Sequence, residues 1–589
     1  MQDLITQLSA IVGAAFAAAG FDAAAGLVRR SDRPDLGDFQ CNGAMMVAKP
    51  VGKNPREVAD CIVNALKANA LFTDVSIAGP GFINLKLTDT VLSAHADALA
   101  VDARAGAAKT EKPQKVLIDF AGPNVAKPMH VGHLRATIIG NSLQHITAFL
   151  GHEKISDAHF GDWGLQVGLL ITKLQAEQPD LPYFRDDYTD AMDLPEPPVT
   201  LEDLERIYPA ASAQMKEDEA YRDRARRATA EMQNGKPAWR ALHRQFWRAS
   251  KPALEREFAA LGVMFDLWKG ESDVDQLIEP MIADLEARGI AGPDEGAVTI
   301  KVERNDDKAK VPPFMLVSSA GSALYGTTDL ATILERQRDL NPDLYLYVVD
   351  QRQALHFVQV FRAAALAGYG RDEQFEHIGF GTMNGADGKP FKTRAGGVVK
   401  LHDLIATARD KAKARLTEAG LGVDLSADEL NSVAQMIGTA ALKFADLSNH
   451  RSTDYIFDFD RFVAFEGKTG PYLQYQGVRV KSLLRRAAAQ NVEAGPITVE
   501  LPEERALVLA LDGFNLAVHL AFAKRAPNVI ADHVYQVSQA FSSFYAAAPI
   551  LADSTPDATR ASRLALAQLT LKQLELGLGL LGIEIPERM

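Results

Sequence analysis

Cysteine is scarce in this sequence, since Cys41 and Cys61 are the only two among 589 residues. Two cysteines are too few for a disulfide framework or a cysteine-based zinc site, which favours a reducing compartment and predicts a cytoplasmic protein. Free cysteine is among the most buried residue types, so we expect each of the two to fill a small apolar position in a core.

Long apolar runs and basic residues near the N-terminus are also lacking. No stretch of about 18 uncharged apolar residues stands out, so we expect no transmembrane helix and no membrane partner. The apolar segment 8–26 is rich in alanine, but no Lys or Arg precedes Arg29. Because a signal peptide needs a basic start, this segment is predicted to be an amphipathic helix of the folded protein.

An excess of positive charge is absent as well, because the formal net charge is −13. That balance argues against non-specific binding of nucleic acid. Two local basic clusters, 222–229 and 479–486, nevertheless stand out. Arg479 and Arg486 fall two turns apart on one face of a predicted helix, although a solvated helix surface is the simpler interpretation of either cluster.

The chain is too long for one core, and changes in composition and hydrophobic pattern along it divide it into parts. The parts are an N-terminal α+β module at 1–108, an α/β domain at 113–404 with a polar helical insertion at about 170–300, a helical connecting region at 405–467, and an all-α domain at 468–589.

Apolar strands alternate with helices in the second of these parts. The strands are predicted at 115–120, 344–350 and 375–383. Such alternation is typical of a parallel sheet, so we expect a Rossmann-type α/β fold there. In the N-terminal module, residues 81–87 alternate apolar and polar side chains and predict a further strand.

The segment AGPNVAKPMHVGHLRATIIG, residues 121–140, joins the first predicted strand to a long helix. Ligands of doubly wound sheets bind at the carboxyl ends of the strands, and a helix start offers unpaired N–H groups to a phosphate. His130 and His133 project from one side of the first turn and can donate hydrogen bonds, while Gly132 would let a flat base lie against the backbone. A pair of capping or core histidines is the alternative.

A second candidate phosphate site is the glycine-rich, basic stretch 385–401, which carries Lys389, Lys392 and Arg394. A cationic loop suits a polyphosphate whose negative charge grows during a reaction. An ordinary basic surface loop is the alternative. Two phosphate-type sites on one α/β sheet indicate an enzyme that uses a nucleotide.

Several ordered blocks of sequence resemble one family over essentially the whole chain. The segment PNVAKPMHVGHLRATIIGNSL resembles the HIGH signature of class I aminoacyl-tRNA synthetases, in the version of the arginyl-tRNA synthetase family. KPFKTR stands where that class usually has KMSKS, with Pro390 inside the motif, which leaves open whether Lys389 or Lys392 acts on pyrophosphate. Further blocks that are similar to the family lie at 159–171, 324–334, 348–357 and 465–480, and in the terminal IPERM.

The resemblance implies a two-step arginine–tRNA ligation by a monomer. L-Arginine and ATP, with Mg²⁺, would give arginyl-adenylate and pyrophosphate, and the arginyl group would pass to the 2′-hydroxyl of the terminal adenosine of tRNA(Arg). Such chemistry rests on positioning and electrostatics, so no protein nucleophile and no metal-ligating residue is expected. The residues implied in ATP binding are Lys127, His130, Gly132, His133, Met383, Lys389 and Lys392. Of these, His130, His133, Lys389 and Lys392 would be catalytic.

The same resemblance assigns the arginine pocket. Asp119, Tyr325 and Asp329 would hold the guanidinium, and carboxylates in fork geometry suit that group. Asn124, His130 and Gln353 would contact the α-amino and carboxylate end. For Asp329 an N-cap of the following helix is the alternative.

The outer modules are implied to bind tRNA. Phe82 and Asn84 would read a base of the tRNA elbow, although Phe82 also fits the core of the small module. Tyr472, Tyr475 and Arg479 would stack on and pair with anticodon bases. A class I synthetase for another amino acid and an inactive tRNA-binding paralogue remain alternatives, whereas a small-molecule nucleotidyltransferase would need neither outer module.

Overall fold

The structure, a computed structural model, describes residues 3–125, 127, 129–319, 323–385, 387–389, 391 and 399–589. These residues form two compact units. Unit 1 comprises 1–109, 416–437 and 464–589, and unit 2 comprises 110–415 and 438–463. The expected connecting region at 405–467 is therefore divided between the two units.

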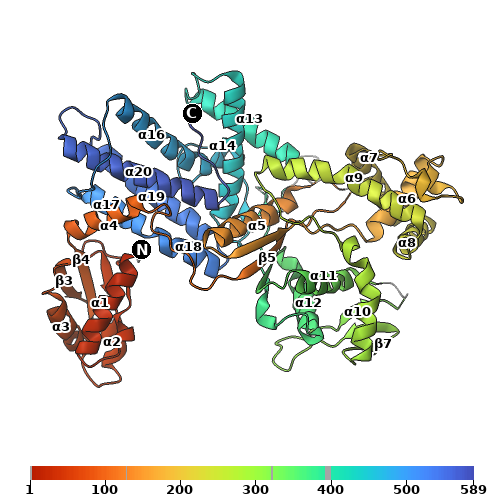
Figure 1. The fold of residues 1–589 in the computed structure, drawn as a ribbon, viewed down its shortest axis with the longest axis horizontal. Helices are drawn as coiled ribbons and strands as arrows, with labels where there is room; N and C mark the ends of the chain where they lie inside the picture. The colour runs from red at the N-terminus through yellow and green to blue at the C-terminus, as the bar shows by residue number, and fades with distance from the viewer. Residues whose placement is uncertain are drawn as a thin grey trace. The chain divides into compact units, whose positions relative to one another are not determined.

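The N-terminal module of unit 1 is an antiparallel sheet with helices against it (Figure 1). The strand order is β1-β2-β4-β3, and the predicted strand at 81–87 is present as β4. Asp3 caps the first helix by accepting a hydrogen bond from the Thr6 N–H at 2.7 Å. The elements are α1 (Leu4–Ala18), β1 (Val28–Arg30), β2 (Phe39–Cys41), α2 (Gly43–Ala48), α3 (Pro55–Leu66), β3 (Phe72–Ala78), β4 (Phe82–Leu87) and α4 (Asp89–Val101).

The C-terminal part of unit 1 is helical throughout, as predicted. Its helices are α16 (Gly470–Ala489), α17 (Pro502–Asp512), α18 (Phe514–Ala523), α19 (Asn528–Ala547) and α20 (Asp557–Leu580). The N-terminal module is fastened to these helices. Arg505 of α17 donates to Asp38 and to the Leu87 carbonyl at 2.8 Å, and His95 of α4 lies 2.9 Å from the Asp512 carboxylate.

One described segment, Pro502–Ala523, is long and apolar enough to cross a membrane by length and composition alone, although the sequence was expected to hold none. Core helices of folded domains pass the same test. In unit 1 its buried Glu504 lies 2.8 Å from Nε of Arg563, and Asp512 pairs with His95. Both buried acidic side chains of α17 thus have partners inside the unit.

Unit 2 is built on a four-stranded parallel sheet of order β11-β10-β5-β6, which confirms the predicted fold class. Helix α5 (Val131–Phe149) packs on β5, and Gly140 makes this possible, because a Cβ there would lie 2.1 Å from Cγ of Phe120. The strands are β5 (Lys115–Phe120), β6 (Glu153–Asp157), β10 (Leu344–Val348) and β11 (Phe375–His377). The third predicted strand is shorter than expected, and β12 (Met383–Asn384) pairs with β13 (Tyr455–Ile456) instead.

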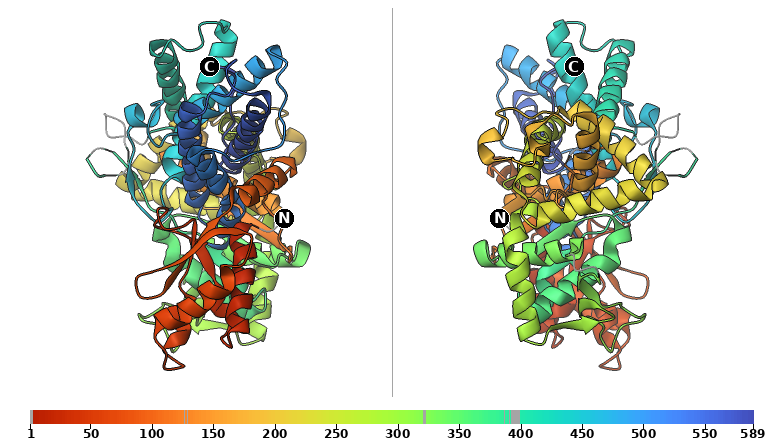
Figure 2. Two further views of the ribbon diagram at one scale, coloured as in Figure 1. Left: turned by 90° about the vertical axis from the view of Figure 1, so that its left-hand side faces the viewer. Right: turned by 90° about the vertical axis from the view of Figure 1, so that its right-hand side faces the viewer.

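The insertion holds a group of helices and then a small antiparallel sheet, β7-β8-β9, the last strand of which lies beyond residue 300. Figure 2 shows its long helices in yellow. The elements are α6 (Leu165–Glu177), α7 (Leu201–Glu217), α8 (Glu219–Gln233), α9 (Pro237–Ala260), α10 (Asp275–Ala287), β7 (Ala291–Asp294), β8 (Ala297–Ile300) and β9 (Phe314–Val317).

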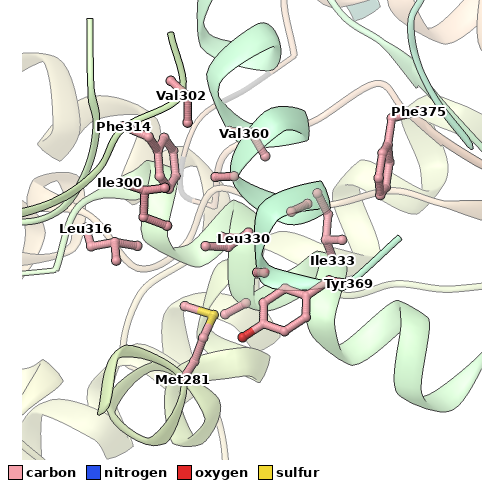
Figure 3. Close-up of a cluster of buried hydrophobic side chains, with 14 of the residues drawn as sticks. Met281, Ile300, Val302, Phe314, Leu316, Leu330, Ile333, Val360, Tyr369 and Phe375 are labelled. Carbon is pink, nitrogen blue, oxygen red and sulfur yellow. The ribbon is translucent and has the colours of Figure 1, made fainter. Parts of the chain in front are cut away.

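A large apolar core joins the small sheet to the parallel one. It draws Met281 from α10 and Phe314 from β9 against helices α11 (Tyr325–Asp339) and α12 (Ala354–Ala367), as Figure 3 shows. Tyr345 and Tyr347 bring β10 into the same cluster. The remaining helices of the described chain are α13 (Leu401–Glu418) and α14 (Ala427–Leu447), which run from one unit into the other, and the short α15 (Phe459–Phe462).

The two cysteines differ in their surroundings. Cys41 is fully buried and its thiol lies 3.3 Å from the Ala25 carbonyl, as expected for a small core residue. Cys61 is exposed, so the prediction for it was wrong. It lies on α3, whose buried positions are Val58, Ala59, Ile62, Val63 and Leu66, and so falls on the opposite face.

Candidate active site

The side chains of two histidines cap backbone N–H groups at the start of α5. Nδ1 of His130 accepts a hydrogen bond from the Gly132 N–H at 3.0 Å, and Nδ1 of His133 accepts from the His130 N–H at 3.1 Å. Their ring centroids are 4.0 Å apart. Capping, which the sequence left as an alternative, is therefore one role of both residues.

The capping bonds fix which ring nitrogen can act on a ligand. Because Nδ1 accepts in each ring, a neutral imidazole carries its proton on Nε2, which remains a donor. Burial lowers the pKa of His130 to about 4, and the charge of Lys127 adds to the shift. Burial also lowers the pKa of His133 to about 3. Both rings are thus neutral at pH 7 and each offers one Nε2–H.

The first backbone N–H groups of α5 already have partners. Val131 donates to the Val399 carbonyl at 3.0 Å, Gly132 to His130, and His133 to the His130 carbonyl at 2.8 Å. The expectation of unpaired N–H groups at this helix start was therefore wrong. Packing also requires glycine at 132, because a Cβ there would lie 2.7 Å from the His130 ring, and the contact of Gly132 with a base stays a prediction.

The basic loop can be placed only in part. Lys389 is exposed, and its N–H donates to Asp387 at 3.1 Å. Lys392 and Arg394 lie outside the described residues. Met383 is buried in β12, where its carbonyl accepts from the Phe391 N–H at 3.1 Å.

Asp119, at the end of β5, is bound by the chain's own guanidinium. Nη2 of Arg336 lies 2.7 Å from Oδ2 of Asp119 and 2.7 Å from Oδ2 of Asp157, and Nη1 donates to the Tyr347 hydroxyl at 3.1 Å. Burial raises the pKa of Asp119, although Arg336 opposes the shift. Burial would also raise the pKa of Asp157, but His159 and Arg336 hold it below its ordinary value. One oxygen of Asp119 is therefore not free to meet a ligand.

Asp329 lies in the second turn of α11 and does not cap the helix, because Leu324 holds the N-cap position. Its Oδ2 lies 2.6 Å from Nε2 of His356. The ring of Tyr325, which is 57% exposed, stacks on His356 at 4.5 Å between centroids. Two of the three residues expected to meet a guanidinium, Tyr325 and Asp329, thus lie together on one histidine.

Glu271 is a candidate site residue that the sequence did not reveal. It opens a short 3-10 helix, Glu271–Val274, and its Oε2 accepts from the Trp163 N–H at 3.2 Å. Burial raises the pKa of Glu271 to about 7, and the negative charge of Asp329 adds to the shift. A carboxyl next to another carboxylate is stabilised by an incoming cation. No motif marks this position, since a short 3-10 helix after a loop carries no sequence signature.

The residues expected at the other end of an amino-acid substrate follow two strands of the sheet. Asn124 follows β5 and lies against Gly161, where a Cβ would come within 2.3 Å of its side-chain oxygen. Gln353 follows β10 at the start of α12 and is exposed. Both lie beyond the carboxyl ends of parallel strands, where ligands of such sheets bind.

In the N-terminal module a polar row crosses one face of the sheet. Arg29 donates to Gln40 at 2.9 Å, and Gln40 donates to Oδ1 of Asn84 at 3.2 Å. Asn84 is 1% exposed, and its Nδ2 has no hydrogen-bond partner among the described residues. Phe82 lies on the same face of β4, half-buried against Gly79.

A pocket of about 430 Å³ lies in the helical part of unit 1. Tyr475 and Arg479 line it together with Arg485, Arg486 and Arg588, which makes the lining strongly cationic. The Arg479 guanidinium lies 3.9 Å from the ring centre of Tyr545, and Arg486 donates a hydrogen bond to the Tyr545 hydroxyl at 3.1 Å. The two arginines therefore lie on one face of α16, as predicted. Tyr472 does not line this pocket and lies 3.4 Å from the Ser542 hydroxyl.

Comparison with known proteins places these features in one class. The family model for the catalytic domain of class I (R) tRNA synthetases matches residues 95–459. The model of the DALR anticodon binding domain matches 473–589, and that of the arginyl tRNA synthetase N-terminal domain matches 2–87. The parallel sheet and the paired histidines at its edge are thus those of a class I aminoacyl-tRNA synthetase.

Relatives narrow the class further. The arginine–tRNA ligases of Maricaulis maris and Hyphomonas neptunium are each 54% identical to the chain, and each alignment covers 100% of both proteins. The crystal structure of arginyl-tRNA synthetase from Plasmodium falciparum superposes with a TM-score of 0.80 over 100% of both chains, at 22% identity, which speaks to the fold alone. The chain belongs to the arginyl-tRNA synthetase family.

The two roles of His130 can be separated by substitution. Asparagine is as good an N-cap as any residue but lacks Nε2–H, so His130→Asn should keep the helix start. We expect its rate of amino-acid-dependent ATP–pyrophosphate exchange to fall by about 10²–10³, as is typical when one transition-state donor is lost. Melting should stay near that of the wild type. If His130→Asn exchanges at the wild-type rate while His130→Ala does not, the histidine acts as a cap only.

Proposed function

We propose that this enzyme activates L-arginine with ATP and transfers it to tRNA(Arg). An oxygen of the arginine carboxylate attacks the α-phosphorus of ATP, and the bond to pyrophosphate breaks. The 2′-hydroxyl of the terminal adenosine then attacks the activated carbonyl, and AMP leaves. The observation that carries the choice of arginine is the group formed by Tyr325, Asp329 and His356, with the charge of Asp329 acting on the pKa of the buried Glu271.

The carboxyl groups of Asp329 and Glu271 suit a guanidinium better than an ammonium. Arginine presents a planar fork of donors, which can satisfy two acidic side chains at once, whereas lysine presents a point charge. Tyr325, stacked on His356, supplies a flat wall on which a guanidinium can lie. Asp119 acts on this site through Arg336, and Asn124, His130 and Gln353 take the α-amino and carboxylate end.

The ATP site draws on the two-histidine turn and the basic loop. Nε2–H of His130 and of His133 would donate to the phosphates, with Lys127 and Lys389 as nearby cations and Lys392 as the other candidate for the departing pyrophosphate. Gly132 and Met383 would border the nucleotide. No cluster of His, Cys, Asp or Glu in the described part of the chain could hold a metal ion. Mg²⁺ would therefore arrive on the ATP phosphates, where it offsets their charge.

The tRNA would contact unit 1. Nδ2 of the buried Asn84, which has no partner among the described residues, and the nearby Phe82 suit a splayed base, which needs an edge contact and a stacking surface. The arginine-lined pocket with Tyr475 and Arg479 suits an unstacked anticodon base and its phosphate, while Tyr472 lies outside that pocket. We also propose that the enzyme acts as a monomer in the cytoplasm.

Amino-acid-dependent ATP–pyrophosphate exchange tests the proposed activity. We expect exchange with arginine and with no other amino acid, because an acidic pocket disfavours an uncharged side chain and the point charge of lysine fits it less well than a planar guanidinium. Exchange is measured across all the amino acids with and without tRNA(Arg). Exchange driven by another amino acid would assign a different substrate, and its absence with all of them would indicate an inactive tRNA-binding protein.

Removing the charge of Asp329 should weaken arginine binding selectively. Asp329→Asn keeps the shape of the side chain and its contact with His356 but loses the negative charge. We expect KM for arginine to rise by roughly 10–100-fold, the usual effect of one charged hydrogen bond, and KM for ATP to change less than twofold. Asp343→Asn is a matched control, because Asp343 binds the Lys115 N–H at 2.8 Å at the other end of β5. Equal effects on both Michaelis constants would place the guanidinium elsewhere.

Arginine binding should weaken in acid because of Glu271. With a pKa of about 7 in the free enzyme, this carboxyl is protonated and uncharged at lower pH, and a neutral carboxyl attracts a cation poorly. KM for arginine should therefore rise as the pH falls from 8 to 6, while KM for ATP changes less. In Glu271→Gln the arginine constant should be high and flat across this range. A slope that persists in Glu271→Gln would show that another group titrates.

A further inference from the structure

Four side chains lie where the helical insertion meets the segment that follows the basic loop. They are Glu205 of α7, Glu257 of α9, Lys400 and His402. We propose that Lys400 and the two glutamates are positioning residues: they hold the two-histidine turn in register for catalysis by anchoring the strand that pairs with it. The inference rests on the proposed activity, since its readout is arginine activation.

The backbone connects this group directly to the histidines. Val131 donates to the Val399 carbonyl at 3.0 Å, and Leu401 donates to the Met129 carbonyl at 2.9 Å. These bonds make an antiparallel bridge between His130 and Lys400. A shift of residues 399–401 therefore shifts the backbone of His130, whose position sets both imidazole rings.

An ion pair between the insertion and Lys400 holds that bridge in place. Nζ of Lys400 lies 2.6 Å from Oε2 of Glu205, whose side chain is only 15% exposed. The hydrogen bond with Glu205 raises the pKa of Lys400, which keeps the ammonium charged. A carboxylate anchored on a helix thus ties down the one residue that bridges His130.

Glu257 holds the same region from a second helix. Its Oε1 lies 3.4 Å from Nδ1 of His402, and its side chain is 12% exposed. Burial raises the pKa of Glu257, the charge of Glu205 adds to this, and the backbone of Met129, the residue before His130, counters it. Two helices of the insertion therefore hold the segment 400–402, which forms one side of the bridge.

Such partly exposed ion pairs add little to global stability, so stability does not explain the arrangement. The arrangement is explained instead by the need to position the histidines. A displacement of about 1 Å in a group that binds the reacting phosphates can lower a rate by up to about 10²-fold. The arrangement also gives the insertion a mechanical link to the active site. The guanidinium site at Asp329 and Glu271 has no part in it, so the two can be told apart kinetically.

Arginine activation by the full-length chain tests the proposal. Lys400→Met and Glu205→Gln should each lower kcat of arginine-dependent exchange by about tenfold. KM for arginine should stay within twofold and the melting temperature should not change. Lys411→Met is the matched control: it removes a lysine of α13, the helix that follows Lys400, which pairs with Asp460 at 2.6 Å, and it should exchange at the wild-type rate.

Restoring the pair separates positioning from a direct contact with ATP. Lys400→Arg, and the charge swap Glu205→Lys with Lys400→Glu, should each recover most of the lost kcat, because either keeps an ion pair at this point. Wild-type kcat in Lys400→Met and Glu205→Gln would overturn the proposal. A swap that stays as slow as the single variants would assign Lys400 to direct ligand binding and overturn it too. If the wild-type chain itself shows no arginine-dependent exchange, the proposed function fails instead.

Discussion

The buried guanidinium of Arg336 is the contact on which the active-site edge of unit 2 depends. It joins Asp119 of β5, Asp157 of β6 and the Tyr347 hydroxyl of β10 to helix α11. Its side chain is 3% exposed, so its charge is stable there only because two carboxylates share it. Breaking such a buried group typically costs about 3–5 kcal/mol, since the remaining charges stay unpaired. The ends of three neighbouring strands and the helix that carries Asp329 are thereby held in one geometry.

That geometry separates two kinds of acidic residue at one edge of the sheet. Asp119 and Asp157 are paired with the guanidinium of Arg336 and are thereby held in fixed positions. In the part of the chain that the structure describes, Asp329 contacts a histidine and no guanidinium, and burial together with the charge of Asp329 raises the pKa of Glu271. The two kinds suit the proposed selection of a cationic side chain, because the first is held by the chain's own Arg336 and the second has no arginine or lysine partner of that kind among the described contacts.

Local pattern was enough for the apolar strands of the sheet, but not for its polar strand or for the contacts between elements. The apolar run at 115–120 gave β5 with both ends correct, whereas the polar strand β6 was missed. Arg336 sits in a polar helix and looks like a solvated residue, because its partners are 217 and 179 residues away. Glu271 was missed because no motif marks its position in the sequence. Cys61 is different, since the helical period of α3 already places it on the exposed face.

The attachment of the N-terminal module to the C-terminal helices has a consequence for synthesis. His95 contacts Asp512 across 417 residues, and Arg505 reaches back to Asp38. At about 5–20 residues per second, the ribosome makes that partner roughly 20–80 s after the histidine. During this interval the module's own sheet can form, but the acidic and imidazole groups of its attachment surface face solvent. Unit 1 therefore matures last, although it contains the first residues to emerge.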